Sequence, residues 1–197
     1  MYTVVGSVAS RTFRVVWLLE ELEQPYTVIP AKPHGKAVRA HSRLGKIPVL
    51  LDGPVTVSDS LAIMTYLADK HAGLTAQAGT PERAVQDAMT FRLLDELESV
   101  IWTFARHTFV LPEAERVPGV LPSLQLEFMR NLDRLTSEIQ SPFLMGEHIT
   151  LPDLLLVHLG NWARFAGFPD APSAFLDYAR PIRARAAYQR TIAQRKI

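Results

Sequence analysis

Residues 45–60 constrain the fold more than any other stretch, because a proline precedes one apolar segment and an acid–hydroxyl pair precedes the next helix. Proline cannot donate a hydrogen bond within a sheet, so Pro48 must precede a strand or be its first residue. We predict a cis Ile47–Pro48 bond, since X–Pro is the bond type in which cis is accessible. Asp59 and Ser60 open the following helix, where a carboxylate, a hydroxyl and free N–H groups converge. These groups suit the zwitterionic head of an amino acid.

The first thirty residues predict a strand, a helix and a second strand. Residues 2–5 are β-prone, and Ser10 is expected to cap a helix. That helix is predicted by apolar residues spaced as i, i+3, i+4 and i+7, namely Val15, Leu18, Leu19 and Leu22. Pro25 ends it, and a strand is expected over residues 26–29. The order is therefore β-α-β, followed by a variable stretch and then β-β-α.

Composition is that of an ordinary soluble protein and excludes several functions. The chain has 197 residues, of which 48% are hydrophobic and 21% charged, which favours one or two domains. A net charge of +1 gives no argument for nucleic acid, and none is expected as a partner. The absence of cysteine excludes disulfides and cysteine metal sites, and no metal is expected. No signal peptide is recognisable, and the longest apolar run, near residues 154–159, is too short for a membrane. We therefore expect a cytoplasmic protein.

Strand signals end after a linker over residues 69–79, and apolar residues at helical spacing follow. Thr80, followed by proline, predicts a helix start. Thr150 with Asp153 three residues later predicts a capping box. The helix that it opens is apolar on all sides and is expected in the core. The basic residues between 180 and 196 are expected to form a solvated helix face.

Four segments in this order resemble cytosolic glutathione transferases: residues 10–22, 45–50, 59–67 and 143–153. The resemblance spans nearly the whole chain and is to bacterial, serine-type members with a theta-like register. It implies an α/β thioredoxin-like N-terminal domain over residues 1–72 and an all-α C-terminal domain over residues 80–197. It also implies a homodimeric detoxification enzyme, a glutathione S-transferase, that takes glutathione as co-substrate and conjugates it to a small hydrophobic electrophile.

Glutathione transfer requires the thiolate, because a free thiol, with a pKa of about 8.5, is mostly protonated at neutral pH and is a poor nucleophile. The resemblance implies that Ser10 is the catalytic residue and donates to the sulfur from a helix N-terminus. Ser10 precedes Arg14 by four residues, as in theta-like members, whereas the zeta- and tau-like register falls on Ala9, which cannot donate. Ser7 is the alternative. The absence of cysteine excludes the thiol chemistry of omega- and beta-like members.

Glutathione is implied to bind along Ile47 and Pro48 and at Asp59 and Ser60. Asp59 suits the ammonium group of the γ-glutamyl head, while Ser60 and the helix N–H groups suit its carboxylate. Asp59 can also cap the helix, and the two roles can coexist. Lys46 is expected either to meet the glycyl carboxylate or to face solvent. The chain lacks the Asn-Pro that the family often has before Gly-Lys, so the glycyl end is the least defined.

Two arginines stand where cations oppose the helix dipole, in the first turn of a predicted helix. Arg11 and Arg14 therefore either neutralise a bound anion or point to solvent. The resemblance implies that the electrophile binds between the two domains, with Trp102, Arg106 and His107 as candidate contacts.

Two rival functions stay open at this point. One is an isomerase or peroxidase reaction with the same co-substrate, and the other is a non-catalytic interaction module of the same fold. The presence of Ser10, Asp59 and Ser60 favours the enzyme. Glutathione affinity without turnover of any electrophile would favour the module.

Overall fold

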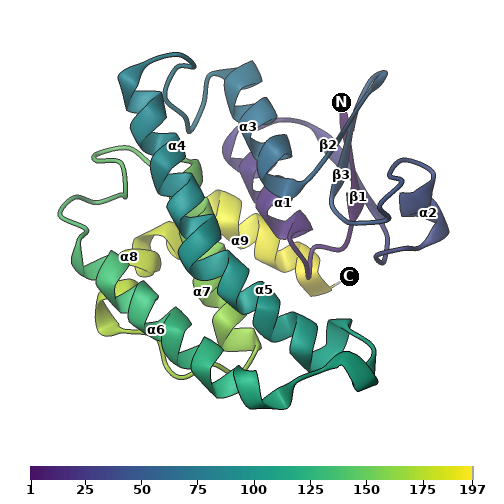
Figure 1. Cartoon of the computed structure of the whole chain (residues 1–197). Coiled ribbons are helices and arrows are strands. Elements are labelled where there is room, and N and C mark those ends of the chain that lie inside the picture. Colours follow the sequence, from purple (N-terminus) through teal and green to yellow (C-terminus); the bar gives the residue numbers. More distant parts are fainter. Residues whose placement is uncertain (197) are drawn as a thin grey trace. The chain divides into compact units, whose positions relative to one another are not determined.

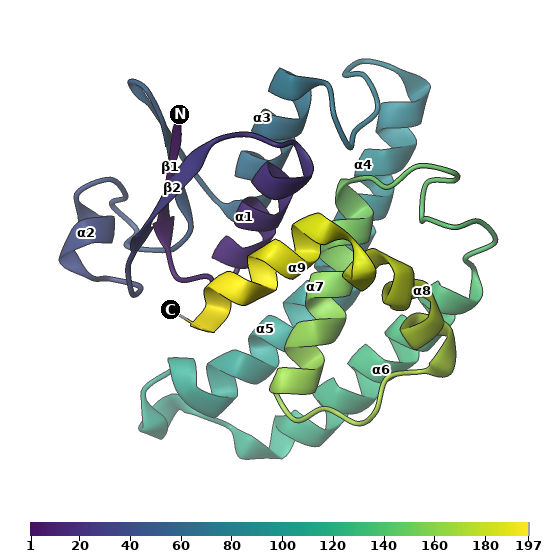
Figure 2. The same ribbon diagram turned by 180° about the vertical axis from the view of Figure 1, so that it is seen from behind.

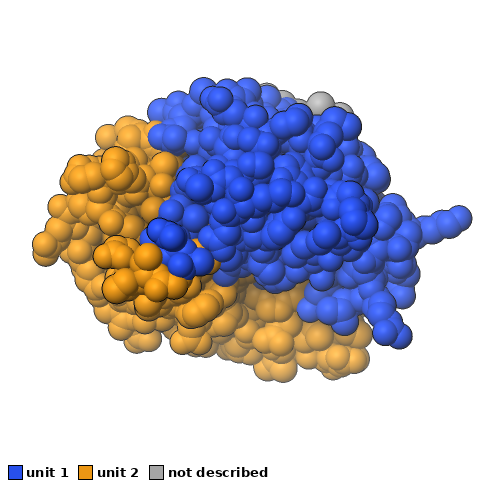
Figure 3. Space-filling model, turned by 90° about the horizontal axis from the view of Figure 1, so that it is seen from above, with its two compact units in different colours: residues 1–78, 183–197 blue, residues 79–182 orange. Residues whose placement is uncertain are grey.

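The computed structural model describes residues 1–196, without the side chain of Lys196. Ile197, the end of the expected helical domain, and the Lys196 side chain, the end of the expected basic face, lie outside this description. The chain divides into two compact units, residues 1–78 with 183–197 and residues 79–182 (Figure 3). The expected domains, residues 1–72 and 80–197, differ from these units because the last fifteen residues group with the N-terminal part.

A four-stranded mixed sheet forms the centre of the first unit (Figure 1). Its strands are β1 (Tyr2–Gly6), β2 (Tyr26–Pro30), β3 (Val49–Asp52) and β4 (Val55–Ser58), in the spatial order β2-β1-β3-β4. β1 and β2 are parallel, whereas β3 is antiparallel to both β1 and β4. The first two strands each extend one residue beyond the prediction.

Helices cover both faces of this sheet (Figures 1 and 2). They are α1 (Thr12–Glu21) and α3 (Ser60–His71) on one face and the short α2 (Lys36–Arg39) on the other. Successive side chains of a strand point to opposite faces. The neighbouring residues Val4 and Val5 are both fully buried for this reason, and Val5 clusters with Val38 of α2 and Val49 of β3.

The C-terminal helix α9 (Ala186–Ala193) packs along α1 within the first unit (Figures 1 and 2). The ring of Tyr188 lies 4.9 Å from that of Trp17 and 5.6 Å from that of Phe13, measured between centroids. A short 3-10 turn, η5 (Gln194–Lys196), follows α9. This packing explains why residues 183–197 belong to the first unit.

The expectation of a solvated basic face over residues 180–196 is wrong for Arg185, which is half-buried, whereas Arg190 is exposed but also pairs with a carboxylate. Arg185 donates to both carboxylate oxygens of Glu21, with its Nε 2.8 Å from Oε1 and its Nη2 2.7 Å from Oε2. Arg190 donates through Nε to Glu20 Oε2 at 2.5 Å. These acceptors lie on α1, so both arginines connect the C-terminal segment to α1.

The second unit is helical, as predicted. Its main helices are α4 (Pro81–Leu93), α5 (Ser99–Ala105), α6 (Leu121–Ser137), α7 (Leu151–Phe165) and α8 (Ser173–Ala184), the last of which runs two residues past the unit. Two π-helical segments, η1 (Leu94–Glu98) and η2 (Arg106–Val110), flank α5, and two 3-10 turns, η3 (Glu113–Glu115) and η4 (Pro118–Val120), precede α6. Thr80 caps α4 as predicted, its hydroxyl accepting the Arg83 N–H at 3.2 Å.

The predicted capping box opens α7 and organises the core of this unit. Asp153 is fully buried and accepts two bonds from Thr150, from the N–H at 2.7 Å and from the hydroxyl at 2.8 Å. Its other oxygen accepts the Leu144 N–H at 2.8 Å and the Tyr178 hydroxyl at 2.5 Å. Burial raises the pKa of Asp153, and the four donors oppose that rise.

Among the described residues, no helix is long and apolar enough to cross a membrane.

Candidate functional site

Three segments of the first unit leave the sheet at the same edge, and the strand register explains why. Val5, next to the end of β1, lies opposite Val49, the first residue of β3. Val49 in turn lies opposite Ser58, the last residue of β4. The loop after β1, the segment before β3 and the start of α3 after β4 are therefore neighbours. This edge is the candidate site.

The segment before β3 contains the predicted cis bond, between Ile47 and Pro48. Pro48 is buried, Ile47 is half-buried and Lys46 is exposed. A Cβ added to Gly6, at the end of β1, would lie 3.3 Å from the Cβ of Ile47. Ile47 thus lies directly beside the end of β1, while the exposure of Lys46 is compatible with either role expected for it.

Asp59 is the N-cap of α3, one of the two roles expected for it. Its Oδ1 accepts the Leu61 N–H at 2.9 Å and the Ala62 N–H at 3.1 Å. The residue is exposed, and within the described part of the chain no bond uses its second oxygen, Oδ2. Capping therefore leaves one carboxylate oxygen of Asp59 open to a cationic ligand.

Arg14 connects α1 to the start of α3. Its side chain is 1% exposed, and Nη1 donates to the hydroxyl of Ser60 at 3.4 Å. Ser60 is itself buried. The alternative that Arg14 points to solvent is therefore wrong. A guanidinium stays charged at any physiological pH, so a fixed positive charge lies behind the N-terminus of α3, where an anion is already favoured.

Ser10 lies in the turn just before α1, one residue earlier than the N-cap position, which Arg11 occupies in a helical conformation. The predicted cap was displaced because the Phe13 N–H bonds to the Ser10 carbonyl at 2.9 Å, which closes a tighter turn than an α-helical one. The Ser10 hydroxyl still accepts the first helical N–H, that of Thr12, at 3.2 Å. Ser10 therefore lies at the helix N-terminus, as the proposed chemistry needs.

Ser7 and Ser10 belong to one turn and are both half-buried. The Ser7 carbonyl accepts two bonds from Ser10, from its N–H at 2.9 Å and from its hydroxyl at 2.7 Å. The Ser7 hydroxyl accepts the Ala9 N–H at 3.3 Å. Both hydroxyls lie in the loop after β1, so both residues remain candidates by position.

Sequence reasoning missed two residues that shape this loop, Thr12 and Gly6. Thr12 is fully buried, and its hydroxyl lies 3.1 Å from that of Ser10. A Cβ on Gly6 would lie 2.2 Å from the Thr12 hydroxyl oxygen, so only glycine leaves room for it. The one signal in the sequence was a hydroxyl residue two positions after Ser10, which by itself predicts only a helix start.

The three residues expected near the electrophile lie in the second unit. Trp102 is on α5, with its ring centroid 6.5 Å from that of Trp162 on α7. Arg106 and His107 lie on the π-helical segment η2. Arg106 donates to the Thr103 hydroxyl at 2.8 Å, and His107 Nδ1 accepts the Val117 N–H at 3.2 Å. The His107 ring thus stabilises the segment that follows η2.

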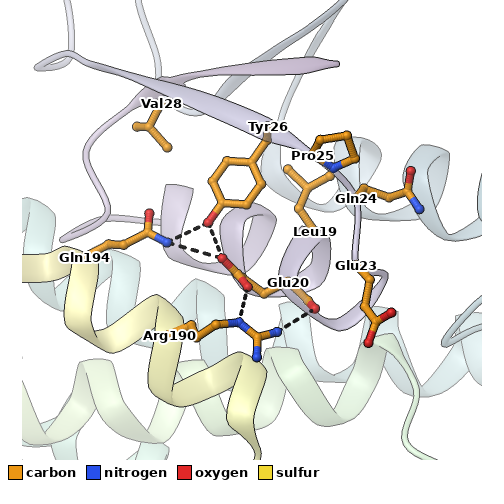
Figure 4. A pocket seen from close by; sticks show the side chains of 9 residues that line it. All are labelled: Leu19, Glu20, Glu23, Gln24, Pro25, Tyr26, Val28, Arg190 and Gln194. Atoms are coloured by element: carbon orange, nitrogen blue, oxygen red, sulfur yellow. Dashed lines mark hydrogen bonds and ion pairs between the residues drawn. The ribbon is translucent and has the colours of Figure 1, made fainter.

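A separate cavity of about 720 Å³ opens at the other end of α1 (Figure 4). Its lining comprises Leu19, Glu20, Glu23, Gln24, Pro25, Tyr26, Val28, Arg190 and Gln194. The Tyr26 hydroxyl donates to Glu20 at 2.5 Å and accepts from Gln194 at 2.6 Å. Burial raises the pKa of Tyr26 to about 12. These polar groups bond to one another, so they hold α9 in place.

Within residues 1–196, no three acidic or histidine side chains are grouped to hold a metal.

Comparisons with known proteins point to one protein family. Residues 2–75 match the family model described as "Glutathione S-transferase, N-terminal domain". "Glutathione S-transferase 3" of Schizosaccharomyces pombe is 39% identical over 66 residues, which cover 32% of this chain and only 27% of that protein. "Putative glutathione S-transferase alpha-2" of Dictyostelium discoideum is 26% identical over 165 residues, covering 83% of this chain and 75% of that protein.

A solved structure extends the likeness to both units. The theta class glutathione S-transferase of Xanthomonas axonopodis pv. citri, with glutathione bound, is 27% identical, covers 97% of this chain and 96% of that chain, and has a TM-score of 0.79. Residues 2–75 thus match the N-terminal domain of glutathione S-transferases, and the whole chain resembles cytosolic glutathione transferases. The expected fold of this family, a thioredoxin-like N-terminal part followed by helices, is thereby confirmed. The relatives and solved structures carry the name of the expected enzyme, glutathione S-transferase.

Proposed function

We propose that this protein is a glutathione transferase that conjugates the thiolate of glutathione to a small hydrophobic electrophile. The observation that carries the proposal is the meeting of Ser10, the Ile47–Pro48 step and the start of α3 at one sheet edge. The theta class relative at 27% identity was solved with glutathione bound, which supports glutathione as the co-substrate here.

Each part of glutathione has a partner in the proposed pose. The γ-glutamyl ammonium meets Asp59 Oδ2, and its carboxylate meets the Ser60 hydroxyl and N–H in front of the buried Arg14 charge. The backbone of Ile47 pairs with the central peptide, as an added strand pairs with a sheet edge. Lys46 is exposed at the glycyl end and is assigned to the second carboxylate.

The chemistry proceeds from the bound thiolate. The thiol proton leaves to solvent, and the Ser10 hydroxyl turns from the Ser7 carbonyl to donate to the sulfur anion. A sulfur lone pair then forms a bond to an electron-poor carbon of the electrophile. The displaced electron pair departs with a leaving group in a substitution; in an addition it moves onto the activating group, and the adduct then takes up a proton from solvent. Ser7 is the alternative donor.

The test is Ser10→Ala with a chlorodinitrobenzene as electrophile. A charge-assisted hydrogen bond is worth roughly 1.5–3 kcal/mol, and 1.36 kcal/mol corresponds to about one pKa unit. The variant should therefore raise the pKa of the bound thiol by about 1–2 units and slow conjugation about tenfold or more. Glutathione should still bind.

Other outcomes would change the assignment. Unchanged conjugation in Ser10→Ala, together with impaired Ser7→Ala, would transfer the role to Ser7. Wild-type protein that binds glutathione but turns over no electrophile or peroxide in a panel would contradict the enzymatic function and favour an interaction module.

We further infer a cytoplasmic homodimer, which the resemblance to cytosolic glutathione transferases supports. Light scattering at micromolar concentration should give twice the chain mass of 22.0 kDa. A monomer mass under these conditions would contradict the inference.

A further inference from the structure

Thr12, the first residue of α1, is fully buried although it carries a hydroxyl. The oxygen atoms of the Thr12 and Ser10 hydroxyls lie 3.1 Å apart. The Thr12 N–H also points to the Ser10 hydroxyl oxygen, at 3.2 Å. Thr12 thus places two hydrogen-bonding groups against the Ser10 hydroxyl oxygen. In the proposed function, this hydroxyl donates a hydrogen bond to the thiolate of glutathione.

The direction of the bond between the two hydroxyls follows from counting protons. A serine hydroxyl has a single proton to donate, and that of Ser10 goes to the Ser7 carbonyl at 2.7 Å. In the 3.1 Å contact the Ser10 oxygen is therefore the acceptor, and Thr12 is the donor. Ser10 accepts two bonds, both from Thr12.

We propose that Thr12 is a positioning residue that orients and polarises the Ser10 hydroxyl for donation to the glutathione sulfur. Two donors to its oxygen fill both lone-pair directions, which leaves the Ser10 proton to point away from Thr12. Hydrogen bonds in a chain also strengthen one another, so a hydroxyl that accepts two bonds is a better donor. This inference rests on the proposed function of Ser10.

The surroundings of Thr12 keep its hydroxyl in this place. The side chain is wholly enclosed, and its hydroxyl oxygen would lie 2.2 Å from a Cβ on Gly6. Its methyl carbon would lie 3.2 Å from the same atom. The bare backbone at Gly6 thus provides the space that Thr12 fills, and a packed side chain has little freedom to turn its donor elsewhere.

The test compares Thr12→Val, which keeps the shape and removes the hydroxyl, with Thr12→Ser, which keeps the hydroxyl. Thr12→Val should slow conjugation about three- to tenfold, the range expected for one neutral hydrogen bond. It should also move the acidic limb of the pH–rate profile, and the ultraviolet thiolate absorbance of bound glutathione, to higher pH. Thr12→Ser should recover most of the rate and the wild-type pH profile.

Two controls separate this role from a merely structural one. Affinity for S-methylglutathione, which has no thiol to ionise, should be the same in wild type and Thr12→Val. In the double variant Ser10→Ala/Thr12→Val, the pH profile should match that of Ser10→Ala alone, because Thr12 acts through Ser10.

Three results would overturn the inference. They are a wild-type pH profile in Thr12→Val, an equal loss of affinity for glutathione and S-methylglutathione, or additive effects in the double variant. If Ser10→Ala itself leaves the pH profile unchanged, the proposed role of Ser10 fails. An impaired Ser10→Ala beside a normal Thr12→Val overturns only the role of Thr12.

Discussion

Asp59 combines two features at the residue scale that bear on ligand binding. Its φ of 77° lies in a region that few residues other than glycine adopt. One of its carboxylate oxygens caps α3, and the other is exposed. The cap therefore needs a short side chain with an acceptor oxygen, whereas only a cationic ligand needs its charge.

Asp59→Asn and Asp59→Ala separate these roles. Asn keeps an oxygen for the cap but lacks the charge, so it should raise KM for glutathione with a smaller change in kcat, the signature of lost uniform binding. Ala loses the cap as well and should also lower stability by about 1 kcal/mol. A glutathione analogue without the γ-glutamyl amine is the control. If Asp59→Asn discriminates between the two ligands as strongly as wild type, Asp59 is only a cap.

The sequence predicted the site residues that belong to short motifs. It missed the residues that come close to the site only when the chain folds. The cis bond at Ile47 and the cap at Asp59 depend on immediate neighbours in the chain, so local rules predict them. Thr12 and Gly6 matter because β1 ends under the first turn of α1, and their closeness appears only in the folded unit. The hydrogen bond of Arg14 likewise joins it to Ser60, 46 residues later in the chain.

At the scale of elements, docking of α9 on α1 is the main feature that sequence patterns did not reveal. Arginines at helical spacing have the same pattern whether they face water or buried carboxylates. The difference lies in Glu21, whose side chain is 4% exposed, while that of Arg185 is 38% exposed. Its carboxylate also accepts the Trp17 indole N–H at 3.0 Å. A buried carboxylate with these partners depends on Arg185 for charge compensation.

Arg185→Ala should therefore lower the free energy of unfolding by about 1–2 kcal/mol, because it leaves Glu21 buried without its cation, with the half-exposed position reducing the effect. The stability of Arg185→Lys should lie between that of wild type and that of Arg185→Ala, since lysine keeps the charge but cannot make the bidentate hydrogen bond. Urea unfolding measures both. The matched control is Arg180→Ala, which breaks a pair whose side chains are 74% and 65% exposed and should change stability by less than about 0.5 kcal/mol. Equal losses in the two alanine variants would refute the docking role.

On the scale of the whole molecule, the chain completes its first unit with its last residues. Residues 79–182 form a unit from one continuous stretch, whereas the first unit needs residues 1–78 and 183–197 together. Tyr188, 6% exposed between Trp17 and Phe13, is the main apolar contact of the returning segment. Stability in α1 should therefore depend on a residue more than 160 positions away.

Tyr188→Ala should speed amide hydrogen exchange in α1 and β1 and leave α6 and α7 nearly unchanged, because exchange reports local opening. Phe128→Ala is the matched control in the second unit, where Phe128 is fully buried and its ring centroid lies 5.2 Å from that of Phe168. It should show the reverse pattern. If both variants sped amide exchange equally in both units, the division into two units would be contradicted.

The discontinuous first unit also fixes an order of events during synthesis. Chains emerge from the ribosome N-terminus first, and their domains generally fold as units. The sheet and α1 emerge before anything else, yet the aromatic surface around Trp17 stays uncovered until residues 183–197 have been translated. The contiguous helical unit can pack before that moment. The nascent chain therefore exposes this aromatic surface until residues 183–197 have been translated. We expect a chaperone to bind there.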